Sequence, residues 1–111
     1  MPAAATRCNA ALAAARPGCD SVYYGHIGDG NLHLVAWVPG LAAADQPKPL
    51  MDDIVYGTVR DFAGSISAEH GIGTTKRPYL GYARSEAEID LMRRLKAALD
   101  PLGLLNPGKV V

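Results

Sequence analysis

The stretch that decides the fold is SVYYGHIGDGNLHLVAWV, residues 21–38. Residues 21–25 are rich in valine and tyrosine, which favour a β-strand. Residues 31–38 carry Leu, Leu, Ala and Val at alternate positions, a pattern that predicts a second strand with one buried face. Gly28-Asp29-Gly30 lies between the two and is typical of a turn with positive φ angles. The stretch therefore predicts an antiparallel β-hairpin.

Helices are predicted before and after this hairpin. An alanine-rich helix is expected over residues 3–16, because Pro17-Gly18 ends it. Apolar side chains at three- and four-residue steps predict a helix over residues 50–62, with Gly64 as its C-terminal cap. Ser85-Glu86-Ala87-Glu88 matches a capping box, so a further helix is expected to start there.

The order of elements indicates the fold class. A short third strand is expected at residues 65–68, and one or two helical turns are expected within residues 73–80. The pattern is helix, strand, strand, helix, strand, helices, which predicts an α+β fold with a ferredoxin-like antiparallel sheet and helices on one face. The unit looks incomplete, because it lacks a first strand. The unpaired edge left by that strand favours association with another chain, including a homodimer.

Composition narrows the class of protein. The chain has 111 residues and is expected to form a single domain, 1–111. With 49% hydrophobic and 20% charged residues, it is typical of a globular protein, and 11 basic residues balance 11 acidic ones. That balance gives no basis for binding nucleic acid, and no apolar run approaches the ~20 residues of a membrane span. Cys8 and Cys19 are not in a Cys-x-x-Cys spacing, which favours reduced thiols and a cytoplasmic protein.

All three histidines lie in two short glycine-rich stretches. His26 and His33 flank the predicted turn, and His70 follows Glu69 in the second stretch. Two imidazoles and a carboxylate suit a catalytic zinc or a non-haem iron. The turn folds the chain back, so His26 and His33 are able to share one face despite their odd spacing. A third imidazole beside the carboxylate suits a proton acceptor.

Other interpretations of these residues stay open. A single histidine in a strand is usually a satisfied polar group, and Gly28-Asp29-Gly30 could cradle a phosphate, although it leads into a strand and not a helix. One geometric conflict also stands. If the expected strand at 65–68 ran parallel to the strand at 31–38, His33 and Glu69 would lie at opposite sheet edges.

Three motifs together resemble one known family. They are GHIGDGNLH at residues 25–33, EHGIG at residues 69–73 followed by Lys76, and NPGK at residues 106–109. In this order they resemble the C-terminal domain of FAD-linked oxidases. That family includes D-lactate dehydrogenases, the glycolate oxidase D subunit and D-2-hydroxyglutarate dehydrogenase. The resemblance runs from about residue 20 to the end of the chain.

The resemblance implies a role for each motif residue. It implies that His26, His33 and Glu69 bind a divalent metal of the zinc type, and that His70 takes the proton from the substrate hydroxyl. It places Asn31, Asn106 and Lys109 near the flavin or the substrate. The activity implied is oxidation of a small D-2-hydroxy acid of the lactate, glycolate or 2-hydroxyglutarate type, by hydride transfer to FAD.

Family members carry an N-terminal FAD-binding domain, and residues 1–20 of this chain show no flavin-binding motif. The chain is therefore expected to be the C-terminal half of the cap, or substrate, domain. It is expected to need a flavin-binding domain or subunit as partner and to be inactive alone. Two alternatives are a stand-alone metal-binding protein with hydrolase or oxygenase chemistry, and a non-catalytic remnant that folds and dimerises.

Overall fold

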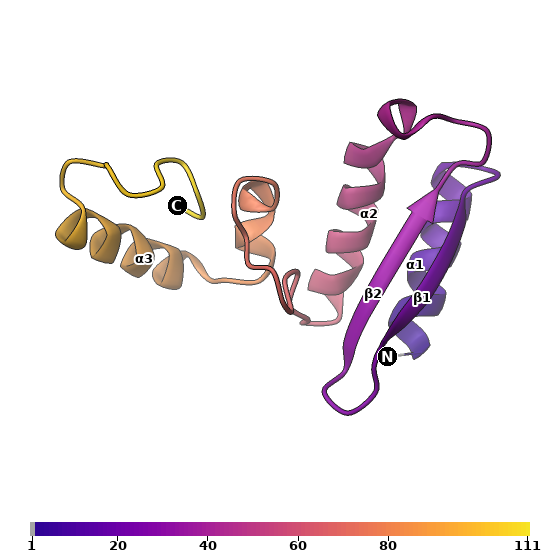
Figure 1. The fold of residues 1–111 in the computed structure, drawn as a ribbon. Helices are drawn as coiled ribbons and strands as arrows, with labels where there is room; N and C mark the ends of the chain where they lie inside the picture. The colour runs from indigo at the N-terminus through magenta and orange to yellow at the C-terminus, as the bar shows by residue number, and fades with distance from the viewer. Residues whose placement is uncertain (1) are drawn as a thin grey trace. The chain divides into compact units, whose positions relative to one another are not determined.

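The computed structural model describes residues 2–111, which fall into two compact units, one ending at Phe62 and the other beginning at Ala63. Each unit is described here by itself. The first unit contains two helices, a two-stranded sheet and one short 3-10 helix (Figure 1). In chain order these are α1 (Pro2–Ala15), β1 (Asp20–His26), β2 (Asn31–Trp37), η1 (Ala43–Asp45) and α2 (Lys48–Asp61).

The hairpin forms as the sequence predicts. β1 and β2 pair antiparallel, in a register that sets Tyr24 opposite His33 and His26 opposite Asn31. Residues 27–30 make the connecting turn, in which Gly30 adopts a φ of 76° and donates its N–H to the His26 carbonyl at 3.1 Å. The left-handed conformation of Gly30 explains why glycine stands there. This turn fixes which side chains share a face of the sheet.

Helices α1 and α2 cover one face of the hairpin. The core of the first unit is formed by Cys8 and Leu12 of α1 and Met51 of α2, and Leu34 and Ala36 of β2 pack against it. Burial raises the pKa of the Cys8 thiol, so Cys8 serves as a small apolar core residue. Because side chains alternate along a strand, Val35, between Leu34 and Ala36, and His33 before Leu34 point to the opposite, open face.

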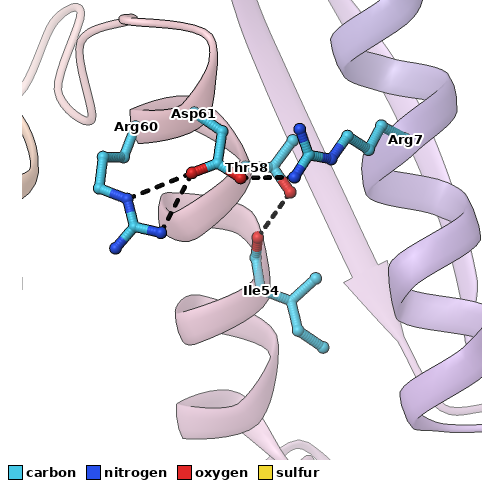
Figure 2. Close-up of polar contacts among 5 residues, drawn as sticks. All are labelled: Arg7, Ile54, Thr58, Arg60 and Asp61. Carbon is cyan, nitrogen blue, oxygen red and sulfur yellow. Dashed lines mark hydrogen bonds and ion pairs between the residues drawn. The ribbon is translucent and has the colours of Figure 1, made fainter.

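Polar contacts also join α1 to α2. Figure 2 shows Asp61 between two guanidinium groups, one from Arg7 of α1 and one from its neighbour Arg60. The Arg60 hydrogen bonds, and after them the charge of Arg7, hold the pKa of the Asp61 carboxyl below its ordinary value. In the same view, the buried Thr58 hydroxyl donates to the Ile54 carbonyl at 2.8 Å. The Arg7–Asp61 ion pair ties the last turn of α2 to α1, and the other contacts lie within α2.

The second unit has less regular structure. It contains η2 (Arg77–Tyr82) and α3 (Glu86–Leu99). The predicted capping box is present: the Ser85 hydroxyl accepts from the Glu88 N–H, and the Glu88 carboxylate accepts from the Ser85 N–H. Both orphan donors at the helix start are thereby satisfied. No helix among residues 2–111 is long and apolar enough to cross a membrane.

The α+β class is confirmed, and two local predictions are wrong. Residues 65–68 form no strand. The Ser65 hydroxyl donates to the Ser67 carbonyl at 3.1 Å, and this local hydrogen bond competes with the backbone hydrogen bonds that would pair the segment with another strand. The parallel strand behind the geometric conflict is therefore not formed. Gly64 is not the cap of α2, since the helix ends at Asp61 with Phe62 as its C-cap, and Ala63 takes the left-handed φ of 53°.

Candidate functional site

The hairpin brings His26 and His33 to the same end of its open face. In the observed register His33 lies opposite Tyr24, two residues from His26 along β1, so both imidazoles project from the side that the helices leave uncovered. Their ring centroids are 5.9 Å apart at an interplanar angle of 62°. A nitrogen of one ring lies within 4.8 Å of a nitrogen of the other.

This spacing fits two imidazoles that share one metal ion. With a metal–nitrogen distance of 2.0–2.1 Å, each ring centre lies about 3.2 Å from the ion, so two ring centres lie at most about 6.4 Å apart. The observed 5.9 Å is within that limit. His26 is exposed and His33 half-buried, so an ion is able to reach both.

Gly25 makes this close pairing of the strands possible. A Cβ atom at Gly25 would lie 2.0 Å from the carbonyl oxygen of Asn31, a distance that real Cβ atoms do not adopt. Gly28 by contrast has open space around it. The sequence interpretation gave weight to Gly28 and Gly30 and missed Gly25. The available signal was its place beside His26, where a residue of poor strand propensity interrupts the strand.

Tyr24 is a second residue that sequence reasoning missed. Its ring stacks on that of His33, with centroids 4.9 Å apart and an angle of only 4° between the planes. The two residues are direct cross-strand partners. Because side chains alternate along a strand, Tyr24 and His26 lie on the same face. The residue opposite Tyr24 on the other strand depends on the length of the turn, which the sequence does not specify.

The second unit holds Glu69 and His70 on a short, closed loop. The Ser67 hydroxyl donates to the Gly71 carbonyl at 2.6 Å and joins the two ends of this loop. Lys76 donates in turn to the Ser67 hydroxyl at 3.3 Å. Nε2 of His70 lies 3.9 Å from Oε2 of Glu69, and the side chains of these two residues are 89% and 39% exposed. The loop thus presents a carboxylate and an accessible imidazole side by side.

The C-terminal tail starts from a buried carboxylate. Asp100 at the end of α3 accepts from Lys96 and from the backbone N–H groups of Leu104 and Leu105, the latter two at 2.9 Å. The Lys96 hydrogen bond, together with these backbone donors, lowers the pKa of Asp100 to about 2. Lys96 also donates to the Leu105 carbonyl. Four hydrogen bonds from three donor groups therefore fix the first residues of the tail.

The tail returns to the loop that carries Glu69 and His70. The Val110 N–H donates to the Gly73 carbonyl at 2.9 Å, and the Arg77 guanidinium donates to the Gly108 carbonyl at 3.3 Å. The exposed Lys109 lies between these two anchor points, and the exposed Asn106 lies two residues before the first of them, Gly108. The second unit therefore groups Asn106 and Lys109 with the Glu69–His70 loop, as parts of one tied segment.

Asn31 belongs to the first unit, at the start of β2. It is only 9% exposed, and its N–H donates to Oδ1 of Asp29 at 3.1 Å, as expected for an aspartate that ties this turn. The predicted site residues thus form two groups. One contains His26, Asn31 and His33 at one end of the hairpin, and the other contains Glu69, His70, Asn106 and Lys109.

Comparison with known proteins agrees with these motifs. Residues 1–110 match the family described as FAD linked oxidases, C-terminal domain. A D-2-hydroxyglutarate dehydrogenase of Stutzerimonas stutzeri (strain A1501) is 48% identical over 97 residues, which cover 85% of this chain and 21% of that protein. The mitochondrial D-2-hydroxyglutarate dehydrogenase of Rattus norvegicus is 44% identical over 90 residues, covering 81% of this chain and 16% of that protein.

A third relative carries a different name. The D-2-hydroxyglutarate–pyruvate transhydrogenase of Saccharomyces cerevisiae is 44% identical over 98 residues, covering 88% of this chain and 19% of that protein. The chain thus spans about a fifth of the length of these relatives. The resemblance stated from the three motifs is confirmed, and the chain belongs to the FAD linked oxidase family, matching its C-terminal domain.

Proposed function

We propose that this chain supplies the metal-binding and proton-accepting part of an FAD-dependent dehydrogenase that oxidises a D-2-hydroxy acid. The observation that carries the proposal is the pair of imidazoles, His26 and His33, at ligand spacing on the open face of the hairpin. Family membership and relatives named D-2-hydroxyglutarate dehydrogenases support the substrate class. Among the acids considered, 2-hydroxyglutarate is therefore the first to test.

The proposed metal ligands are His26, His33 and Glu69. The two neutral imidazoles provide nitrogen donors, and Glu69 adds the anionic oxygen donor that completes a three-ligand set with a position open for substrate. A zinc-type ion in this place would act as a Lewis acid that orients the 2-hydroxy acid and lowers the pKa of its hydroxyl. Gly71, which follows His70, has open space where a Cβ would stand and so leaves room for the substrate to approach.

The proposed general base is His70. Its ring is 89% exposed and next to Glu69, so it is accessible to a hydroxyl group held at that carboxylate. One imidazole nitrogen would accept the hydroxyl proton, a role that histidine often takes as a general base. The flavin supplies the hydride acceptor, and we propose that it is bound mainly by sequence outside these 111 residues.

Three further residues are proposed to contact the flavin or the substrate: Asn31, Asn106 and Lys109. The side-chain amides of the two asparagines offer both donors and an acceptor, and the Lys109 ammonium suits a carboxylate or a phosphate. The hydrogen bonds from Val110 to Gly73 and from Arg77 to Gly108 keep the tail with the Glu69–His70 loop. This grouping favours a shared role for these residues in binding.

Metal content tests the ligand assignment. The purified chain is expected to contain zinc by elemental analysis, and His26→Ala and Glu69→Ala are each expected to lose it. Glu86→Ala is the matched control, because Glu86 is an exposed carboxylate in the first turn of α3, in the same unit as Glu69. A metal content unchanged in both ligand variants would refute the assignment.

Activity tests the flavin assignment. We expect no turnover when the chain alone is supplied with FAD and D-2-hydroxyglutarate, D-lactate or glycolate. The same residues joined to the preceding sequence of a full-length relative are expected to be active, and His70→Ala in that protein should lower kcat by about 10²- to 10⁴-fold. Turnover by the chain alone would contradict the claim that the flavin site lies mainly elsewhere.

A further inference from the structure

We propose that Tyr24 is a positioning residue that holds the imidazole of His33 in the orientation needed to bind the ion. This inference rests on the proposed metal site and assigns a role to a residue that the motif comparison leaves without one. Tyr24 would act through His33 and would not itself bind the ion or the substrate.

The geometry of the pair is specific. Tyr24 and His33 face each other across the strands of the hairpin. Their rings are nearly parallel, at 4°, with centroids 4.9 Å apart, which is the offset-stacked arrangement that aromatic pairs prefer. His26 meets His33 at 62° from its own position on β1. The ring plane of His33 is thereby defined relative to both neighbours.

Tyr24 contributes little to the core of the first unit. Its side chain is 59% exposed, and it lies on the face of the hairpin opposite to the helices. Its neighbour Tyr23 has the opposite environment, because its hydroxyl donates to the Ala5 carbonyl of α1 at 3.0 Å. A large aromatic ring on the open face is therefore better explained by its contact with His33 than by helix packing.

Stacking restricts the torsion that decides where the ligand nitrogen points. Rotation about χ2 of histidine is broad, so an isolated imidazole samples many ring planes. A neighbouring ring parallel to it removes most of that freedom before the ion binds. Groups that orient a ligating histidine typically change metal affinity by 10- to 100-fold when they are removed. We expect an effect at the lower end for an exposed stack.

Two substitutions at one position separate the ring from the hydroxyl. Tyr24→Phe keeps the stack and removes only the hydroxyl. Tyr24→Val removes the ring but keeps a residue that favours β-strands, so the hairpin is expected to persist. Val22→Ala is the control, because Val22 is exposed on the same strand and face but pairs with Val35 and not with a histidine.

Two measurements on the whole chain test whether Tyr24 orients His33. Proton NMR reports the stack directly, since the Tyr24 ring current shifts the His33 ring protons upfield. Zinc titration by calorimetry reports the consequence. Wild type, Tyr24→Phe and Val22→Ala are expected to share the shift and the affinity. Tyr24→Val is expected to lose the shift and to bind zinc about tenfold more weakly.

The outcomes that would overturn the inference are distinct. Equal zinc affinity of wild type and Tyr24→Val, with the upfield shift lost, would show that the stack does not matter for binding. A shift that persists in Tyr24→Val would show that Tyr24 does not stack on His33. Zinc bound by none of the proteins would overturn the metal site itself and the inference with it.

Discussion

The two units of this chain are held together by different kinds of interaction. The first unit, up to Phe62, combines a strand ladder with a core in which Leu12 is 2% exposed. The second unit relies on a capping box, a closed loop and a tail fixed by Asp100. It leaves most of its leucines exposed, namely Leu91, Leu95, Leu99, Leu102, Leu104 and Leu105.

Because of this difference, the two groups of candidate site residues are held with different rigidity. His26 and His33 stand on strands that are fixed by pairing and by the helices behind them. Glu69 and His70 stand on a loop fixed by a few polar contacts with exposed backbone, which is the kind of segment that opens locally at low free-energy cost. We infer that the imidazole pair is preformed, and that the carboxylate and the base adjust more readily when ligands bind.

The largest difference in stability is expected between a leucine variant in the first unit and one in the second. Leu12→Ala should lower the free energy of unfolding by about 3 kcal/mol, because it leaves a cavity in the core. Leu99→Ala, at a side chain that is 80% exposed, should change it by less than about 0.5 kcal/mol. Urea unfolding followed by Trp37 fluorescence and by circular dichroism measures both. A comparable loss in Leu99→Ala would mean that the leucines of α3 are packed, and the comparison of the units would fail.

A smaller effect is expected at the hairpin end. Gly25→Ala should cost about 2 kcal/mol, since its Cβ would meet the Asn31 carbonyl oxygen and push the strands apart. The same shift would move His26 away from His33 and weaken zinc binding. Gly28→Ala is the matched control in the same hairpin, where a Cβ meets nothing within 4 Å. Equal stability of the two variants would contradict the close approach described at Gly25.

The smallest effect on stability is expected from lowering the pH, and it should be confined to the second unit. The folded pKa of Asp100 is about 2, below the ordinary value of 3.8. A lowered folded pKa means that the carboxylate stabilises the tail fully above about pH 4, and that this contribution is lost as the pH falls through about 2. Protection of the Leu104 and Leu105 amide protons against exchange, relative to the intrinsic rate at each pH, should fall over that range. Asp100→Asn should show low protection of these amides at every pH, and high protection in that variant would show that other contacts hold the tail.

The elements that could be predicted from sequence are those with a strong local signal. Alternating apolar residues and a glycine turn predicted the hairpin, and apolar residues at three- and four-residue steps predicted α2. The capping box at Ser85 predicted the start of α3. These signals come from residues a few positions apart, so backbone geometry alone decides them. The turn between His26 and His33 also indicated that the two residues are able to share one face, without specifying the register.

The features that could not be predicted depend on side chains that compete with the backbone or meet across strands. The expected strand at 65–68 failed because serine side chains bond locally there. The close approach at Gly25 and the Tyr24–His33 stack depend on the register, which a change of one residue in the turn would alter. Nothing local in the sequence specifies that register, so the structure was needed to find them.

We propose that His26, His33 and Glu69 bind one ion together. Zinc titration of wild type, His33→Ala and Glu69→Gln by calorimetry tests it most directly, with Glu86→Gln as control. We predict one ion per chain in the wild type and in the control, and an affinity at least about tenfold lower in each ligand variant. Wild-type affinity in Glu69→Gln, with binding lost in His33→Ala, would contradict the claim, because the ion would then be held by the hairpin alone.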